Sequence, residues 1–435
     1  MRRKPVGEQE LDSLLARKED IGRRLEGGKN HVYWLPTPHG PVVARRRKTP
    51  FQALADHMLH KTYDVLPRLV PHTAWAAAAR HTDVVPPVLH AGPEWLVVAG
   101  VAGRNGEPAE TAPENLADWS DEFVDTFAAA VGKLTAIPKS SVMHPQAAPE
   151  TDMNRYMRRY VEYVRERCLI DERRKEYDAL GRGLGFPLKV SEFLDAFKDG
   201  WAPVGFGVQH FDLHPGNTLV GVFFVDIDGA RWAPHGSDLS RLPNMLRSEP
   251  DAQVLPKAMA RMAKAYGPSI PEKDRDGFEA NWAPLCAFDL LRSIGIQMHL
   301  TFQKADAPLA AYRDRYKKEA GLRYREELLA GSATLMCGAV NKARAMLWQQ
   351  PPITLAAVAE RLAPMFGVRL PPDDLIFNSR LVDRRITQGL PALDRGRPQA
   401  LPSTAHPGTG LRDGDYAPGT RGIARSLDLG LSRER

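Results

Sequence analysis

The sequence predicts an α+β protein with two lobes, a small strand-rich lobe first and a larger, mainly helical lobe after it. The chain has 435 residues, which is more than one hydrophobic core usually serves. Short β-prone runs are concentrated early in the chain, and helical periodicity dominates later. The C-terminal part is rich in Pro, Gly and Arg, which predicts a disordered basic tail. We therefore place the first lobe at residues 1–103, the second at 104–375 and the tail at 376–435.

Composition excludes several classes of protein. The formal net charge is +6, but the ten arginines and six acidic residues from Arg380 to Arg435 supply +4 of it. The remaining charge is ordinary for a folded protein, so we predict no nucleic-acid partner and leave the tail's partner open. Cys168, Cys286 and Cys337 lie far apart, which argues against disulfides or a zinc site and favours the cytoplasm. No stretch reaches the roughly 18 apolar residues of a membrane span, so no membrane contact is predicted.

The first lobe begins with a predicted helix over residues 11–25, where leucines recur at helical spacing before Gly27 and Gly28. Strands follow near residues 32–35 and 41–46, because β-prone runs flank the turn sequence Pro-His-Gly. The segments VVPPVLHAG and EWLVVAGVAG predict two further strands, and a short connector follows near residues 101–106.

The second lobe opens with a predicted amphipathic helix in the segment that starts at Asn115. Phe123, Phe127 and Val131 recur at its helical spacing, and Pro138 ends it. Further helical patterns cover residues 153–171, 189–198, 252–265, 278–302, 312–350 and 355–365. This part of the chain is therefore predicted to be mainly helical.

One segment interrupts the helices with an unusual density of polar groups: QHFDLHPGNTLVGVFFVDIDGA, residues 209–230. Asp212 lies five residues before Asn217, and the Pro-Gly pair between them favours a turn that brings both side chains together. The apolar run after Asn217 is broken at Gly221, which predicts a tight hairpin. That hairpin would return the chain and place Asp226 beside Asn217.

Two carboxylates and one amide oxygen are the kind of ligand set that suits Mg²⁺, which usually keeps several waters and binds substrate phosphates as well. In phosphoryl transfer one aspartate orients the attacking hydroxyl and accepts its proton, and metal ions neutralise charge on the phosphates. Asp212 suits the first role, and Asn217 with Asp226 the second. The alternative is a solvated turn, because Asp and Asn are common in turns.

The segment HFDLHPGN resembles the H-x-D-x-x-x-x-N catalytic loop of the aminoglycoside phosphotransferase and choline kinase branch of the protein-kinase-like superfamily. His210, Asp212 and Asn217 match that loop, and the resemblance implies that Asp226 binds metal and that Asp238 braces the loop. His210 is expected to hold the loop backbone rather than to transfer a proton. For Asp228 two roles stay open, a share in the metal site or a place on the surface.

The resemblance extends over residues 11–242 and implies a bilobal protein-kinase-like fold. The segment LEGGKNHVYWLPTPHGPVVARRR is similar to the opening hairpin of the family. By this resemblance Gly27 and Gly28 let the backbone approach the phosphates of ATP, and Arg45 stands near the strand-three cation. Backbone groups from Val97 to Ala99 would bind the adenine. A glycine helix cap followed by a surface basic run is the alternative interpretation.

Three positions depart from the family pattern. Arg45 stands where many kinases have Lys, with Arg46 or Lys48 as the choices in a slipped register. No Glu occurs between Gly27 and Glu94 to pair with this cation, which leaves Asp56 or Asp64 as substitutes. Phe211 replaces a frequent Gly.

The function expected from these features is that of an ATP-dependent, Mg²⁺-requiring kinase that phosphorylates a hydroxyl of a small molecule. An atypical protein kinase and a degenerate pseudokinase that acts as a binding scaffold are the alternatives. Polycationic acceptors need an acidic cleft, whereas Asp171 and Glu172 lie among several arginines. That mixture is typical of a solvated helix surface, so the acceptor stays open.

Overall fold

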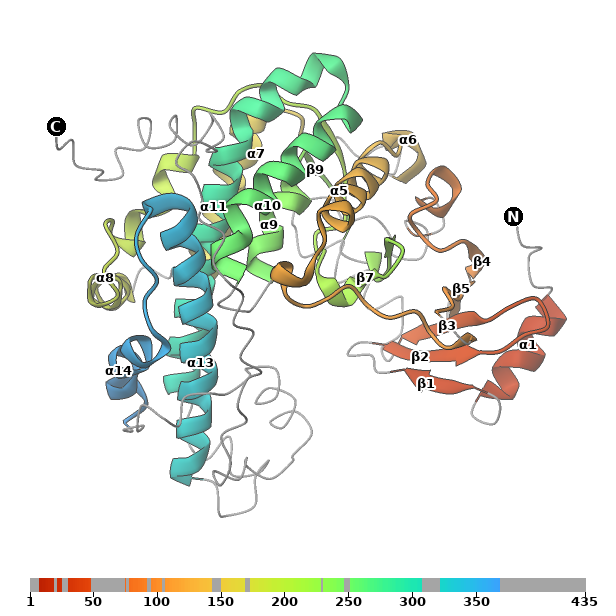
Figure 1. Cartoon of the computed structure of the whole chain (residues 1–435), viewed down its shortest axis with the longest axis horizontal. Coiled ribbons are helices and arrows are strands. Elements are labelled where there is room, and N and C mark those ends of the chain that lie inside the picture. The colour runs from red at the N-terminus through yellow and green to blue at the C-terminus, as the bar shows by residue number, and fades with distance from the viewer. Residues whose placement is uncertain are drawn as a thin grey trace. The chain divides into compact units, whose positions relative to one another are not determined.

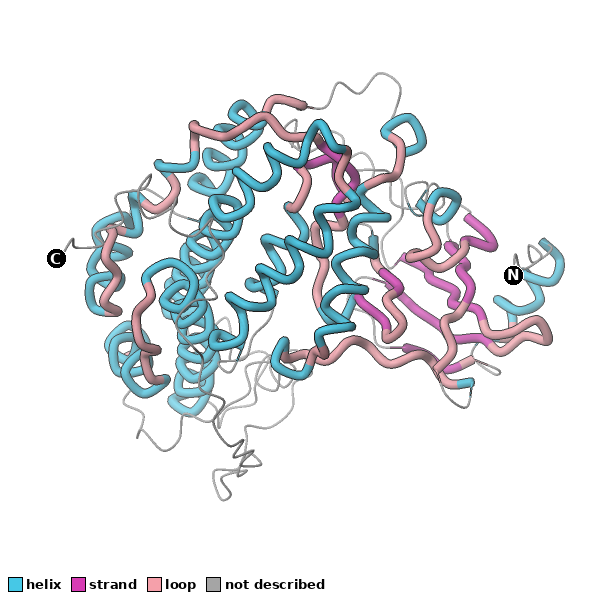
Figure 2. Tube along the Cα trace, turned by 45° about the horizontal axis from the view of Figure 1, so that its top comes forward, coloured by secondary structure: helices cyan, strands magenta, loops and turns pink. Residues whose placement is uncertain are grey.

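The computed structural model describes residues 8–18, 22–25, 30–47, 75, 78–91, 95–103, 106–142, 150–168, 173–227, 230–245, 251–306 and 321–367. The chain divides into two compact units. The first comprises Met1–Tyr156, Trp201–Leu246 and Lys257–Trp282, and the second comprises Met157–Gly200, Arg247–Pro256 and Ala283–Arg435. Strands occur in the N-terminal and central segments, and helices make up most of the remainder (Figures 1 and 2). The predicted tail over 376–435 lies outside the described residues.

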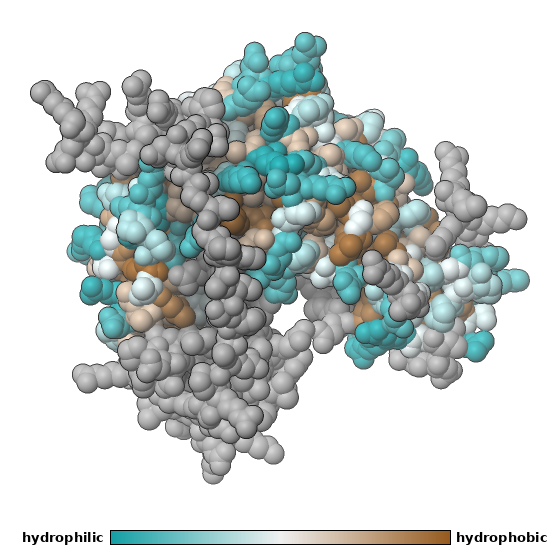
Figure 3. Space-filling view, in the orientation of Figure 1, coloured by the Kyte–Doolittle hydropathy of each residue, from teal (hydrophilic) through white to brown (hydrophobic). Residues whose placement is uncertain are grey.

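The N-terminal sheet has five antiparallel strands in the order β1-β2-β3-β5-β4. Their bounds are Arg23–Leu25 for β1, Asn30–Leu35 for β2, Val42–Arg47 for β3, Val88–Ala91 for β4 and Trp95–Ala99 for β5. Helix α1, Glu8–Ala16, lies against the sheet (Figure 1), and Leu15 packs with Tyr33 and Val97 in a shared apolar core. The surface over this sheet is largely hydrophilic (Figure 3).

The predicted hairpin and the two further strands are confirmed as β2, β3, β4 and β5. The predicted helix over 11–25 is wrong in its second half, because Arg23–Leu25 forms β1. There Leu25 pairs with Val32 and Arg23 pairs with Trp34, so the backbone bonds of this segment go to the sheet.

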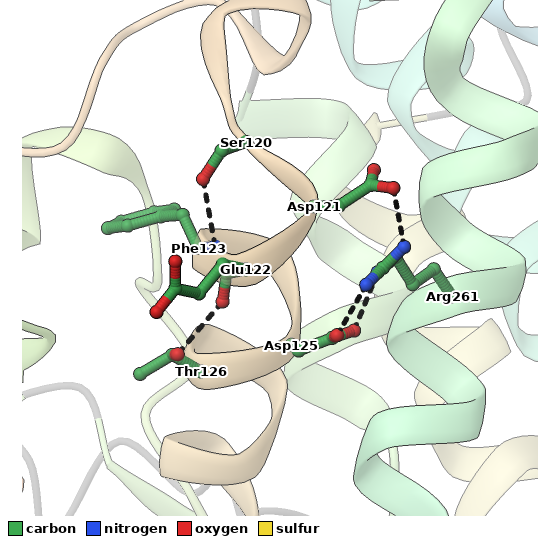
Figure 4. Close-up of polar contacts among 7 residues, drawn as sticks. All are labelled: Ser120, Asp121, Glu122, Phe123, Asp125, Thr126 and Arg261. Carbon is green, nitrogen blue, oxygen red and sulfur yellow. Dashed lines mark hydrogen bonds and ion pairs between the residues drawn. The ribbon is translucent and has the colours of Figure 1, made fainter.

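Helix α5, Asp121–Thr135, begins where the Ser120 hydroxyl accepts a hydrogen bond from the Phe123 N–H at 3.1 Å (Figure 4). On its other side Arg261, from helix α10, Asp251–Tyr266, donates to both oxygens of Asp125, at 2.7 and 2.5 Å, and to Asp121 at 2.6 Å (Figure 4). The bidentate bond to Arg261 lowers the pKa of Asp125. These contacts attach α5 to α10, and α5 carries Thr135 and Phe127 toward the central strands.

The central strands form two small sheets. Strand β6, Phe206–Gln209, pairs with β9, Arg231–Pro234, and β7, Thr218–Leu219, pairs with β8, Phe223–Phe224. The Phe224 ring meets the Phe127 ring of α5 edge to face, with centroids 5.8 Å apart. Helix α9, Ser237–Met245, follows β9 directly.

The other helices are α6 Lys139–Val142, α7 Met153–Cys168, α8 Arg174–Gly183, α11 Glu272–Asp306, α13 Gly321–Ala343 and α14 Leu355–Phe366. A π-helical turn, Arg344–Trp348, continues α13. The helix predicted over residues 189–198 is wrong, since this segment forms two short 3₁₀ turns, Val190–Glu192 and Asp195–Phe197. No helix in the described ranges combines the length and the apolar character that crossing a bilayer requires.

Candidate active site

The loop between β6 and β7 holds the first two predicted site residues together. Asn217 ends a 3₁₀ turn, Pro215–Asn217, and its Nδ2 donates to the backbone oxygen of Asp212 at 2.9 Å. The same Nδ2 lies 3.5 Å from Asp212 Oδ2. Asn217 is buried, whereas Asp212 is exposed, so the amide fixes the loop from inside while the carboxylate faces outward.

The predicted hairpin after Asn217 is present. Its turn is closed by Val222 N–H donating to Leu219 O at 2.9 Å, with Gly221 at a φ of +91° that favours glycine. The returning chain is attached to the loop because Val225 N–H donates to Asn217 O at 2.9 Å. Asp226 follows at once, so the hairpin brings it beside Asn217. Asp226 itself has a φ of +59°, an uncommon conformation for a residue with a side chain.

Arg45 is the basic residue of β3 that reaches this cluster. Its Nη2 lies 2.6 Å from Asp226 Oδ1, and its side chain is 9 % exposed against 46 % for Asp226. The Arg45 guanidinium also lies 5.8 Å from the ring centroid of Trp75, whose Nε1 donates to Pro86 O. Arg46 is exposed and lies over Trp95, and Lys48, Asp56 and Asp64 fall outside the described residues.

His210 is fully buried, and both of its ring nitrogens are engaged. Nδ1 accepts from the Asp212 N–H at 3.4 Å. A backbone N–H can only donate, so the ring proton is on Nε2, which lies 2.9 Å from Val225 O. His210 thus ties the loop to the end of the hairpin. The contacts of His210 are thus with the loop backbone, and its role as a positioning residue stays a prediction.

Asp238, in the first turn of α9, holds the loop from its other side. Its carboxylate accepts from the N–H groups of His210, at 2.5 Å, and Phe211, at 2.8 Å. Burial raises the pKa of Asp238, and the nearby His210, these two N–H groups and Arg241 partly oppose the rise. The bracing role implied by the resemblance therefore has a clear geometric basis.

Phe211 has a φ of +68°, which explains why a Gly is frequent in the family at this position. Two guanidinium groups contact the Phe211 ring, whose centroid is 4.6 Å from Arg231 Cζ and 3.4 Å from Arg241 Cζ. These contacts stabilise a backbone conformation that a side chain normally disfavours. They involve residues that no sequence signal linked to the loop.

The donor set at the hairpin fits Mg²⁺. Asn217 uses its Nδ2 as a donor, which leaves an amide oxygen, and Asp226 supplies a carboxylate. Hard oxygen ligands completed by phosphates and water are typical of Mg²⁺ sites. The described residues contain no group of three or more His, Cys, Asp or Glu suited to a metal ion, and Asp228 lies outside them. A site here would thus depend on a bound phosphate.

The predicted adenine and phosphate contacts are only partly visible. Val97 and Ala99 lie in β5, beside β3, where Val97 pairs with Ala44 and Ala99 pairs with Val42. The Ala99 N–H already donates to Pro87 O at 2.8 Å, so the sheet uses this donor. Gly27 and Gly28 lie outside the described residues. Sequence reasoning missed Trp75, because nothing in its apolar segment marks it as a neighbour of Arg45.

Comparisons with known proteins identify a family for the chain. The model of the Phosphotransferase enzyme family matches residues 21–276, more than half of the chain. No curated protein matches the sequence.

Solved structures also match. A putative aminoglycoside phosphotransferase from Ralstonia eutropha JMP134 is 11 % identical, with a TM-score of 0.45, over 77 % of this chain and 97 % of that chain. Plasmodium vivax ethanolamine kinase is 11 % identical, with a TM-score of 0.38, over 64 % and 75 %. Spectinomycin phosphotransferase, in complex with ADP and spectinomycin, is 10 % identical, with a TM-score of 0.40, over 84 % and 100 %.

Because these TM-scores are below 0.5, the assignment rests on the family model. It confirms the predicted protein-kinase-like fold class, in which a strand-rich N-terminal sheet precedes a mainly helical part. The protein belongs to the Phosphotransferase enzyme family, and its enzyme class is that of phosphotransferases with an alcohol group as acceptor.

Proposed function

We propose that the protein is an ATP-dependent, Mg²⁺-requiring kinase that phosphorylates a hydroxyl of a small molecule. The observation that carries this proposal is that Asn217 contacts Asp212 and bonds to the backbone of Val225, the residue before Asp226, which pairs with Arg45. These contacts join an exposed carboxylate, two oxygen ligands for a cation and a guanidinium for phosphate, which are the groups that phosphoryl transfer requires.

Asp212 is proposed as the catalytic base. Its carboxylate is exposed, while its backbone is held by Asn217 and His210. In the reaction the acceptor oxygen forms a bond to the γ-phosphorus as its proton passes to Asp212. The bond from that phosphorus to the bridging oxygen breaks, and ADP leaves. A rigid loop with an accessible carboxylate is suited to orienting the hydroxyl for this attack.

Asn217 and Asp226 are proposed to hold the cation through their side-chain oxygens. Mg²⁺ bound there would neutralise charge on the phosphates during transfer. Arg45 is proposed to bind phosphate, and its ion pair holds one oxygen of the Asp226 carboxylate. Gly27 and Gly28 stay proposed phosphate contacts. Backbone groups near Val97 and Ala99 stay proposed for adenine, except for the Ala99 N–H that the sheet uses.

We propose that a neutral or anionic compound with a hydroxyl group is as suitable an acceptor as a polycationic antibiotic. Asp171 and Glu172 lie outside the described residues, but in the second unit arginines on and near α7 form ion pairs with aspartates. Arg165 pairs with Asp195, Arg158 pairs with Asp199, and Arg173 pairs with Asp306. These ion pairs support the interpretation of this helix surface as a solvated surface of mixed charge, because the paired residues form no net acidic face.

The remaining proposals concern context. The cytoplasm is the proposed location, because three scattered cysteines suit a reducing compartment. The lobes at 1–103 and 104–375 stay proposed divisions of function, with nucleotide phosphates bound by the first and the acceptor by the second. No nucleic-acid or membrane partner is proposed, and the role of residues 376–435 stays open.

The test uses purified protein, γ-labelled ATP, Mg²⁺ and a metabolite extract, with products separated by size. We expect Mg²⁺-dependent label on a small molecule, lowered by about a thousandfold or more in Asp212→Asn, since loss of the base removes its proton transfer. Asp83→Asn is the matched control, because Asp83 is an exposed aspartate paired with Lys133. Label on protein alone, or none, would contradict the proposal and point to a protein kinase or a pseudokinase.

A further inference from the structure

A chain of buried polar side chains lies behind the catalytic loop. It joins four elements of the first unit: Thr135 of α5, Gln209 of β6, Asp238 of α9 and Tyr266 of α10. Each of these residues is 6 % exposed or less. Buried polar groups cost free energy unless they are hydrogen-bonded, so the bonds of this chain determine how its members are oriented.

The Thr135 hydroxyl sets the direction of the chain. It donates to Val131 O at 2.9 Å, within its own helix, and therefore acts as the acceptor for its other partners. Those partners are Gln209 Nε2 and the Tyr266 hydroxyl, each at 3.1 Å. The amide of Gln209 is thereby oriented, with its nitrogen toward Thr135. Its oxygen, Oε1, accepts from the Asp238 N–H at 3.1 Å.

The far end of this chain is the N-terminus of α9. The first N–H groups of a helix have no partner within the helix. Here the Asp238 N–H donates to Gln209 Oε1, and the Gly236 N–H donates to the Tyr266 hydroxyl at 3.3 Å. Gly236 has no side chain to supply a cap, and a Cβ at this position would lie 2.8 Å from the Phe278 ring. Gln209 and Tyr266 therefore cap α9 from two other elements.

The cap matters because Asp238 is the residue that holds the catalytic loop. Its two carboxylate oxygens accept from the N–H groups of His210 and Phe211, and Asp212 follows directly. Gln209 precedes His210 in the sequence, so it is connected to the loop through the backbone and also through its bond to Asp238. A displacement of Asp238 would therefore also displace the Asp212 carboxylate.

We infer that Gln209, Thr135 and Tyr266 are positioning residues for Asp212, acting through the first turn of α9. The inference rests on the proposed function, in which Asp212 is the base. Tyr266 remains a neutral donor at neutral pH, in keeping with burial that raises its pKa to about 12. The proposed nucleotide groups lie on β3, on β5, on the hairpin and at Asn217, and none of them belongs to this chain of side chains. Loss of its hydrogen bonds should therefore lower kcat and leave KM for ATP unchanged.

Thr135→Val is the sharpest variant, because it replaces the hydroxyl by a methyl group of similar size. Two donors, from Gln209 and Tyr266, lose their acceptor. Thr135→Ser keeps the hydroxyl and should restore function. Thr301→Val is the matched control, because Thr301 is also buried and its hydroxyl also donates to the carbonyl four residues earlier, Gln297 O at 2.7 Å. Gln209→Met breaks the same chain at a different residue, because it removes the bond to Thr135 and the bond to the Asp238 N–H.

The experiment combines two measurements on the full-length protein. In Thr135→Val and Gln209→Met, kcat should fall about tenfold with KM for ATP unchanged, because each variant removes buried hydrogen bonds from the chain that orients Asp238. Amide hydrogen exchange should show faster exchange at His210 and Phe211 in these variants, with wild-type rates in Thr135→Ser and Thr301→Val.

Two results would overturn the inference: loop amides that exchange as in wild type in both Thr135→Val and Gln209→Met, or an equal loss of kcat in Thr301→Val. A wild-type protein that transfers no phosphoryl group would instead overturn the proposed function. Hydrogen exchange would still decide whether the chain holds the loop, because that readout needs no activity.

Discussion

Acidification should destabilise the protein through one buried histidine. His235 follows β9, is 5 % exposed, and its Nδ1 has no hydrogen-bond partner among the described residues. Burial lowers the pKa of His235 from 6.5 to about 4, with the charge of Asp274 in partial opposition. Between about pH 4 and pH 6.5 the folded state therefore binds fewer protons than the unfolded state. Stability present above pH 6.5 is lost as the pH falls toward 4.

The size of the effect follows from the two pKa values. The full shift corresponds to ~3 kcal/mol of unfolding free energy, of which ~2 kcal/mol is lost at about pH 5. Urea unfolding at about pH 7.5 and about pH 5 measures the loss, with His235→Phe as the variant that cannot titrate. Wild type should lose ~2 kcal/mol more than the variant between the two conditions. Equal losses in both proteins would refute the reasoning.

Two further predictions concern the phosphate site and the packing of the first unit. Arg45→Leu should raise KM for ATP about tenfold or more in steady-state kinetics, because a charge-assisted bond to phosphate is lost, and an unchanged KM would contradict this role. Gly277→Ala should lower the unfolding free energy by ~2 kcal/mol in urea, because its Cβ would lie 1.8 Å from Pro203 O. Gly267→Ala, with nothing within 4 Å of its Cβ, is the control, and equal effects would exclude steric overlap as the cause.

The local parts of the fold were predictable from sequence because their signals are local. The turn between β2 and β3 is marked by Gly40, which has a φ of +100°, and β-prone residues lie on both sides of it. Helix α5 was predicted from its apolar spacing, although it begins at Asp121, where the Ser120 side chain caps it. Strand β1 was missed, because Leu25 continues a helical spacing and its partner Val32 lies across an intervening segment.

The contacts of the candidate site also differ in how far the sequence predicts them. Asp212, Asn217 and Asp226 were placed together from sequence, because one loop and one hairpin connect them. The contact of Arg45 with Asp226 spans 181 positions, so only the family resemblance suggested that Arg45 belongs near the site. Thr135 gave no signal at all, because a threonine at the end of an amphipathic helix is ordinary. Its bonds to Gln209 and Tyr266 are seen only in the folded structure, where distant elements meet.

Asn217 and Asp226 are proposed to hold a divalent cation at the phosphates of a nucleotide, and the catalytic mechanism depends on this cation. The most direct measurement is Mn²⁺ binding in the presence of ADP, followed by electron paramagnetic resonance. Wild type and Asp212→Asn should bind Mn²⁺ with similar affinity, whereas Asp226→Asn should bind it about tenfold or more weakly, because a carboxylate ligand is lost. Undiminished binding in Asp226→Asn, or no ADP-dependent binding in wild type, would contradict the account.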